Sequence, residues 1–184
     1  RGNRIKTIDP EGGEWFTTYS ARNYVLSEAD PLGNTIHYTY DAAGNKTAET
    51  DQNGFTTYYE YDDVNRLIKI TLPQFTSIDP NDNPYEETAY DQSGNIITQR
   101  DTNGLVTTYT YTPRNKVKTV SQNEVIITQY TYDAKGNVTE IQDAMGNITR
   151  NVYDSTDRLS KIMSPVRTEE IPDSGREAVV VWSS

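Results

Sequence analysis

The chain has 184 residues, 34% of them apolar, and a mean hydropathy of −0.79, which leaves little material for a conventional buried core. Its formal net charge of −10 argues against nucleic acid and anionic membranes as partners, since both bind basic surface. The chain has no cysteine, which excludes disulfides and thiol nucleophiles, and it has no apolar run of the roughly twenty residues needed for membrane insertion.

Tyrosine recurs along the chain at a fixed spacing. Seven tyrosines follow one another at steps of 21, 21, 29, 21, 21 and 21 residues: Tyr19, Tyr40, Tyr61, Tyr90, Tyr111, Tyr132 and Tyr153. We call them the ladder tyrosines. A period of this length is typical of an array in which one supersecondary unit is copied. We therefore predict a single repeat array over residues 1–184, with about seven to eight units.

Each unit contains two predicted turns. The fourth residue after every ladder tyrosine is Gly, Asn or Asp, the types that best tolerate a positive φ: Asn23, Gly44, Asn65, Gly94, Asn115, Gly136 and Asp157. The second turn has the pattern Asp-x-x-Gly, as in residues 51–54 and 101–104, which suits a type I turn. Each unit therefore reads as strand, turn, strand, turn.

The segments between the turns alternate with period two in β-favouring residues, as residues 55–61 and 105–111 illustrate. In the returning strand 67–71, Leu67 and Ile70 lie three positions apart, which indicates a bulge or apolar contact on both faces. We predict an all-β fold: an antiparallel β-meander of repeated hairpin units of about 21 residues, with about fourteen strands in a twisted or spiralling sheet. Paired tyrosines such as Tyr38 and Tyr40 are expected to form an aromatic row.

Two longer segments interrupt the regular spacing. Residues 73–87 and 165–177 are rich in Pro, Asp, Glu and Asn and are predicted to be loops that leave the sheet, most simply as variable surface excursions. The repeat register also extends to Gly2 and to Trp182. We therefore expect the chain to be part of a longer array.

The sequence offers little catalytic chemistry. His37 is the only histidine, no nucleophile motif surrounds it, and it alternates with threonines on the strand face opposite Tyr38. We interpret it as a polar strand residue, and we expect no enzymatic activity and no cofactor. The densest group of oxygen ligands makes Asp79, Asn81 and Asp82 weak calcium candidates, and no other metal site is expected.

The tyrosines outside the ladder are candidates for binding. Aromatic rings on a sheet surface can stack on sugar rings, which singles out Tyr38, Tyr58, Tyr59, Tyr109 and Tyr130. A residue that holds the same place in every unit more often packs the repeat together. We favour packing and keep sugar contact as the alternative.

Several segments resemble the signature of the YD-repeat, or Rhs-repeat, family. The resemblance is carried by Tyr-Thr-Tyr-Asp-Ala-Ala-Gly-Asn at 38–45 and by the corresponding segments 59–67 and 130–137. Two units depart from it, because Ser20 and Thr112 stand where the family has aspartate. The segment 30–34, Asp-Pro-Leu-Gly-Asn, resembles the family's Asp-Pro-x-Gly-Leu self-cleavage motif. Asn34 replaces the leucine, so we interpret the segment as an ordinary turn and predict no self-cleavage.

The resemblance implies a large secreted or cell-surface bacterial protein. In this family a β-sheet strip spirals into a hollow shell, which in many members encloses a C-terminal toxin. The implied partners are the rest of the protein's own shell and an enclosed toxin domain.

Two function hypotheses follow. The first is a structural shell segment without catalysis, and the alternative is a module that binds carbohydrate or a cell-surface receptor through its tyrosine face or long loops. Unpaired edge strands further predict self-association.

Overall fold

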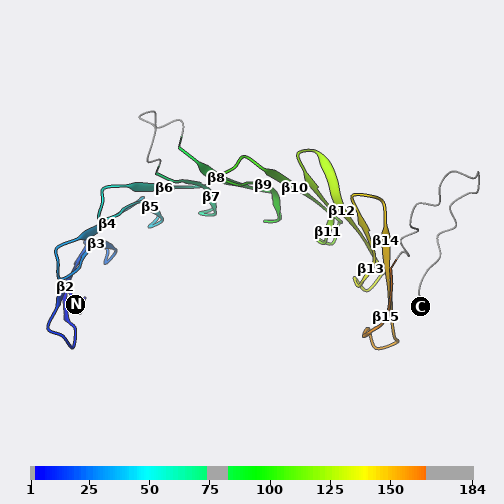
Figure 1. Cartoon of the computed structure of the whole chain (residues 1–184), viewed down its shortest axis with the longest axis horizontal. Helices are drawn as coiled ribbons and strands as arrows, with labels where there is room; N and C mark the ends of the chain where they lie inside the picture. Colours follow the sequence, from blue (N-terminus) through cyan, green and yellow to red (C-terminus); the bar gives the residue numbers. More distant parts are fainter. Residues whose placement is uncertain (1–2, 74–82, 165–184) are drawn as a thin grey trace, which may run out of the picture. The chain divides into compact units, whose positions relative to one another are not determined.

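The computed structural model describes residues 3–73 and 83–164, and this part of the chain contains strands and turns but no helix (Figure 1). The strands are β1 (Lys6–Ile8), β2 (Glu14–Tyr19), β3 (Val25–Ala29), β4 (Thr35–Tyr40), β5 (Lys46–Thr50), β6 (Thr56–Tyr61), β7 (Leu67–Thr71), β8 (Tyr85–Tyr90), β9 (Ile96–Arg100), β10 (Val106–Tyr111), β11 (Val117–Gln122), β12 (Val125–Tyr132), β13 (Val138–Asp143), β14 (Ile148–Tyr153) and β15 (Leu159–Met163). They form a 15-stranded sheet whose order is the order of the sequence. The predicted all-β meander is confirmed.

The chain divides into two compact units. The first comprises Arg1–Ala89 with Gln99–Gly104, and the second comprises Tyr90–Thr98 with Leu105–Ser184. Each is described by itself below. Both are built from the same hairpin, because both contain the same turns and the same antiparallel registers.

The two predicted turns share one geometry. In the turn after β5, Gly54 N donates to Asp51 O at 3.0 Å and Asp51 N donates to Phe55 O at 2.8 Å. In the turn after β6, the corresponding bond from Asn65 N to Asp62 O is 2.9 Å. This pattern is a type I turn closed by a left-handed residue. All seven positions predicted to need a positive φ have one, between 58° and 99°.

Of the two explanations for the spacing of Leu67 and Ile70, a bulge or apolar contact on both faces, the returning strands show the bulge. Glu60 pairs with Lys69 while the next residue, Tyr61, pairs with Leu67, so Ile68 is the extra residue. The same register shift precedes the ladder tyrosine in the hairpins β2–β3, β4–β5, β10–β11, β12–β13 and β14–β15. The bulge brings Leu67 to the face that also carries Ile70, although the two are three positions apart.

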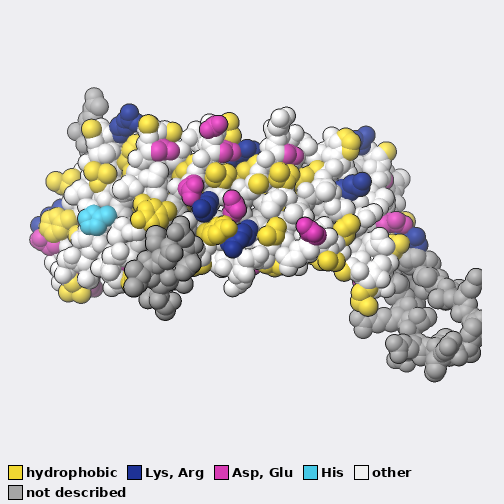
Figure 2. All heavy atoms as spheres, turned by 90° about the horizontal axis from the view of Figure 1, so that it is seen from above, with side chains coloured by type: hydrophobic (Ala, Val, Ile, Leu, Met, Phe, Trp, Pro, Cys, Tyr) yellow, Lys and Arg dark blue, Asp and Glu magenta, His cyan; other side chains and the backbone are white. Residues whose placement is uncertain are grey.

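The sheet is a single layer without a core. Within residues 3–73 and 83–164 no side chain, apolar or polar, is buried. On the face seen in Figure 2, hydrophobic, acidic and basic side chains lie interspersed among uncharged atoms. The low hydropathy of the sequence is thereby explained, because neither face of the sheet packs against a second layer.

The structure corrects the extent of the first long loop. The prediction of a loop at 73–87 is wrong at its C-terminal end, because β8 begins at Tyr85 and pairs with β7 through Thr71–Tyr85 and Lys69–Glu87. Both faces of this sheet are solvated, so charged residues that indicate a loop in a globular protein can stand in a strand here. The second long loop, 165–177, lies outside the described residues.

One hairpin departs from the repeat. Between β11 and β12 the Asp-x-x-Gly turn is replaced by a two-residue turn in which Asn123 and Glu124 both have positive φ, 46° and 69°. Positive φ at both central residues is the type I′ arrangement, which is common in tight hairpins. β12 has eight residues, so longer strands compensate for the shorter turn and the ladder spacing is kept.

Candidate functional site: the tyrosine face and the aspartate turns

The registers place the ladder tyrosines of each unit on one face, which we call the tyrosine face. The tyrosine two positions before a ladder tyrosine lies on the same face, as Tyr38 and Tyr59 do in the first compact unit and Tyr109 and Tyr130 in the second. The opposite face carries cross-strand hydroxyl contacts such as Thr50–Thr56 at 2.9 Å, and we call it the threonine face.

The hydroxyls of five of the seven ladder tyrosines donate to a backbone carbonyl fifteen residues earlier. The bonds are Tyr19 to Arg4 (3.2 Å), Tyr61 to Lys46 (3.1 Å), Tyr111 to Ile96 (2.6 Å), Tyr132 to Val117 (2.6 Å) and Tyr153 to Val138 (3.0 Å). The backbone register between β11 and β12 runs only to the pair Thr119–Gln129, so the Tyr132 hydroxyl reaches a carbonyl beyond the last pair. Desolvation raises the pKa of Tyr132, which keeps it a neutral donor. The ladder tyrosine thus joins consecutive hairpins where the backbone ladder stops.

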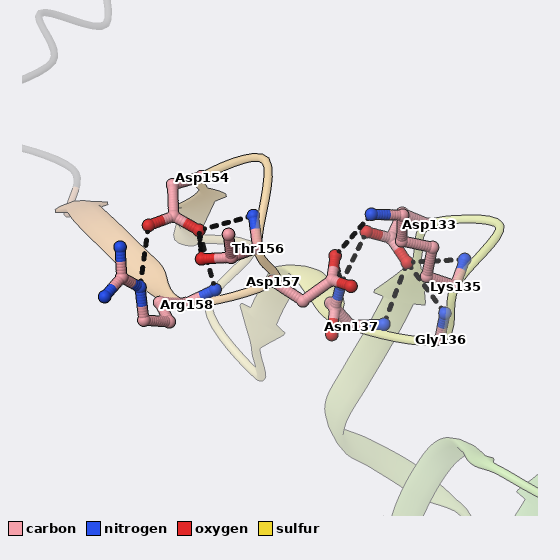
Figure 3. A network of polar contacts seen from close by, with 8 residues as sticks. All are labelled: Asp133, Lys135, Gly136, Asn137, Asp154, Thr156, Asp157 and Arg158. Carbon is pink, nitrogen blue, oxygen red and sulfur yellow. Dashed lines mark hydrogen bonds and ion pairs between the residues drawn. The ribbon is translucent and has the colours of Figure 1, made fainter.

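The aspartate after the ladder tyrosine organises the turn. Asp133 Oδ1 accepts the backbone N–H groups of Lys135 (2.9 Å), Gly136 (2.7 Å) and Asn137 (2.9 Å), and Oδ2 accepts Asn137 Nδ2 at 3.0 Å (Figure 3). The backbone and side-chain hydrogen bonds from Asn137 lower the pKa of Asp133. The carboxylate therefore accepts three N–H groups of the tight turn, one of which, Gly136 N, also donates to the backbone carbonyl of Asp133 at 3.1 Å.

The next turn repeats the arrangement with other side chains. Asp154 accepts Thr156 Oγ1 at 2.7 Å and the backbone N–H groups of Thr156 and Arg158 at 2.8 and 3.0 Å, and it pairs with Arg158 Nε at 3.0 Å (Figure 3). The Thr156 side-chain bond, with the backbone bonds, lowers the pKa of Asp154 to about 2.

In the two repeat units that lack this aspartate, a serine or threonine hydroxyl takes its place. Ser20 Oγ accepts the N–H of Arg22 at 3.3 Å and of Tyr24 at 3.0 Å. Thr112 Oγ1 accepts the N–H of Arg114 at 3.4 Å and of Lys116 at 3.2 Å. The turn is therefore kept in both repeat units, although the hydroxyl accepts longer hydrogen bonds than the carboxylate of Asp133 does and carries no charge.

Consecutive turns are also joined by side chains. Asn45 Nδ2 donates to Asn65 Oδ1 at 2.7 Å in the first unit, and Lys135 Nζ reaches Asp157 Oδ1 at 2.8 Å in the second. Arg22 Nη1 donates to the carbonyl of Ala42 at 2.7 Å. These bonds tie each turn to the turn of the next hairpin, which the sequence period alone did not reveal.

The candidate tyrosines do not form one platform. Tyr58 is 51% exposed and lies on the threonine face, whereas Tyr38, Tyr59, Tyr109 and Tyr130 are half-buried on the tyrosine face. Within the expected aromatic row, the ring centroids of Tyr130 and Tyr132 lie 6.5 Å apart. The ring of Tyr40 stacks on that of Tyr24, with a distance of 5.0 Å between the ring centroids.

Tyr38 belongs to a polar cluster of the first unit. Its hydroxyl donates to Glu28 Oε2 at 3.0 Å, and desolvation together with Glu28 raises its pKa to about 12. Lys46 Nζ lies 5.8 Å from the ring centroid of Tyr38 and 4.5 Å from that of Tyr59, and it pairs with Glu49 at 2.6 Å. Tyr38 and Tyr59 thus lie on either side of the Lys46 ammonium group.

The remaining predicted positions are placed as follows. His37 is exposed on the threonine face, opposite Ser27 on one side and Thr50 on the other. The calcium candidates Asp79, Asn81 and Asp82 lie outside the described residues. In the described ranges no three His, Cys, Asp or Glu side chains are grouped so as to hold a metal ion. No helix there has the length and apolar character of a membrane span.

The first unit also contains an open groove that sequence reasoning missed. It has a volume of about 530 Å³ and is lined on the tyrosine face by Trp15, Thr17, Glu28 and Ile36, with turn residues such as Asp30 at its end. The sequence held one signal for it, since Trp15 stands two residues before the first threonine of a strand that otherwise follows the repeat.

Comparison with known proteins agrees with this geometry. The family model for the RHS Repeat matches residues 19–56 and 90–124. No curated protein matches the chain.

Among solved structures, the crystal structures of TcdB2-TccC3-TEV and TcdB2-TccC3-Cdc42 are similar, each at 17% identity, with TM-scores of 0.65 and 0.57. These two matches cover 89% and 88% of this chain. The structure of the Photorhabdus luminescens Tc holotoxin pore matches 89% of this chain at 16% identity, with a TM-score of 0.48. The chain spans about a tenth of each of these structures, 10%, 9% and 10%. The chain is thus similar to the RHS Repeat family over residues 19–56 and 90–124, the regions that hold its tyrosine ladder and turns, and it shares its fold with the solved structures.

Proposed function

We propose that this chain is a wall segment of a secreted or cell-surface bacterial Rhs-repeat shell that encloses a toxin polypeptide. The observation that carries the proposal is the uncovered sheet, in which no described side chain is buried although the hairpins are tied together at both the ladder tyrosines and the turns. A single-layer sheet suits a wall between a cavity and solvent. Its partners are the remaining repeats of the same protein and the enclosed polypeptide.

The proposal gives the chain a mechanical role without catalysis. The tyrosine hydroxyls, the aspartate turns and the side-chain bonds between turns hold successive hairpins in register. These contacts act between neighbours along the sequence, as in other repeat proteins, so the wall extends by adding units.

Protease protection in the full-length protein tests the proposal. If the repeats form a closed shell, a C-terminal toxin region resists a protease that degrades the same region expressed alone. Weakening the wall with Tyr132→Phe and Asp133→Ala together is expected to shorten that protection. Equal digestion of the enclosed and isolated regions would contradict the proposal.

Binding of carbohydrate or a surface receptor is the second candidate. It is favoured by Tyr58, whose ring is 51% exposed on the threonine face and available for stacking. Calorimetric titration with glycans from an array screen tests it, with Tyr58→Ala as the variant. Saturable binding that Tyr58→Ala abolishes supports a binding module, and no binding above background removes this candidate.

A further inference from the structure

The groove of the first unit combines an exposed aromatic ring with uncompensated negative charge. Its eleven lining residues include Asp9, Trp15, Glu28 and Asp30 and no lysine, arginine or histidine. The Trp15 side chain is oriented by a bond from its Nε1 to Asp9 Oδ2 at 3.3 Å, and the residue remains 46% exposed. An indole that is held in place yet half exposed can receive a ligand on its face.

The three carboxylates accept hydrogen bonds from neutral donors in the described part of the chain. Asp9 accepts Gly13 N–H and the indole, and Glu28 accepts the Tyr38 hydroxyl. Asp30 accepts the N–H of Leu32 and of Asn34 and the Asn34 side-chain amide. Those bonds, the Asn34 side chain first, lower the pKa of Asp30, so it stays ionised at neutral pH.

The basic side chains of the neighbouring strands are already paired. Lys6 of β1 pairs with Glu14 at 2.6 Å, and Lys46 of β5 pairs with Glu49 at 2.6 Å. The groove therefore presents three negative charges around an aromatic face, which is complementary to a cation.

We propose that this groove binds a lysine or arginine side chain of a polypeptide segment. The ammonium or guanidinium group lies against the Trp15 ring within reach of Glu28, and its methylene stem packs on Ile36. A volume of about 530 Å³ holds one such side chain with a short stretch of its backbone. This inference concerns the groove alone and stands whether or not the sheet is the wall of a shell.

Calorimetric titration with a short peptide tests the proposal. The probe is an end-blocked Gly-Lys-Gly-Lys-Gly peptide, and the same peptide with acetylated lysines removes only the charge. We expect saturable binding of the first peptide, weakened by added salt, and none of the second. Fluorescence of Trp15 in a Trp182→Phe background should change with the same saturation curve, which locates the peptide at the groove.

Two variants address the charge in different ways. Glu28→Gln keeps an acceptor for the Tyr38 hydroxyl and should weaken binding about two- to fivefold, the effect of one exposed charge pair. Thr17→Lys, directly opposite Glu28 in the register, supplies a resident cation and should abolish binding. Glu124→Gln makes the same charge change in the β11–β12 turn and should leave binding unchanged. Circular dichroism confirms that each variant keeps its strands.

Other outcomes would overturn the proposal. Equal binding of the acetylated peptide would show that charge is not recognised, and unchanged binding by Thr17→Lys would place the peptide elsewhere. A saturable Trp15 response to a neutral N-acetylglucosamine trimer, without a response to the lysine peptide, would make the groove a sugar site instead.

Discussion

Removing one ladder hydroxyl should destabilise the sheet by a measurable amount. In Tyr132→Phe the ring remains, but the 2.6 Å bond from the hydroxyl to the Val117 carbonyl is lost. A hydrogen bond between neutral groups contributes about 0.5–1.5 kcal/mol, and the half-buried carbonyl lies beyond the last backbone pair of β11 and β12. We expect a loss of about 1 kcal/mol in the free energy of unfolding, equivalent to about 2–4 °C in Tm for a chain of this size.

Urea unfolding followed by circular dichroism measures this loss. The matched control is Tyr58→Phe, which makes the same chemical change at a residue that is 51% exposed on the threonine face. It should shift the midpoint by no more than the error of the measurement. An equal shift in both variants, or no shift in Tyr132→Phe, would refute the idea that the ladder hydroxyl joins consecutive hairpins.

Three further changes test other parts of the account. Thr112→Asp should raise Tm, because it gives the turn a carboxylate in place of a hydroxyl that accepts N–H groups at 3.2 and 3.4 Å; an unchanged Tm would show that the charge adds nothing. Glu124→Gly should stabilise by about 0.5–1 kcal/mol in thermal unfolding, since glycine relieves the cost of φ 69°, and a loss of stability would contradict the turn assignment. The depressed pKa of Asp154 gives stability that is present above the unfolded value of 3.8 and lost as the pH falls toward about 2, so Asp154→Asn should flatten an acid titration of stability over that interval. β1 and β15 each have one partner strand in the described sheet, so sedimentation should show association that grows with concentration, and a monomer at all concentrations would contradict it.

The repeat architecture was predictable from the sequence because its determinants are local. Gly, Asn or Asp, the types that tolerate a positive φ, stands at a fixed distance from each tyrosine, and every such position has a positive φ. The spacing of Leu67 and Ile70 left two explanations open, a bulge or apolar contact on both faces, and the register of β6 and β7 shows that the bulge is present.

The contacts between neighbouring repeat units were not predictable in the same way. The bond from Tyr61 to the Lys46 carbonyl lies beyond the pair Ala48–Tyr58, where the backbone register between β5 and β6 stops, and the sequence does not mark that point. The start of β8 at Tyr85 was missed because its acidic residues resemble a loop, and only the solvated faces of the sheet explain them. The groove at Trp15 joins residues from separate hairpins, so no short motif marks it.

Electron cryomicroscopy of the full-length protein tests the central claim most directly. The account predicts that residues 3–73 and 83–164 form part of a single-layer β wall, with one face toward a closed cavity that contains additional polypeptide density. A reconstruction in which both faces of this sheet are open to bulk solvent, with no enclosed cavity, would contradict it.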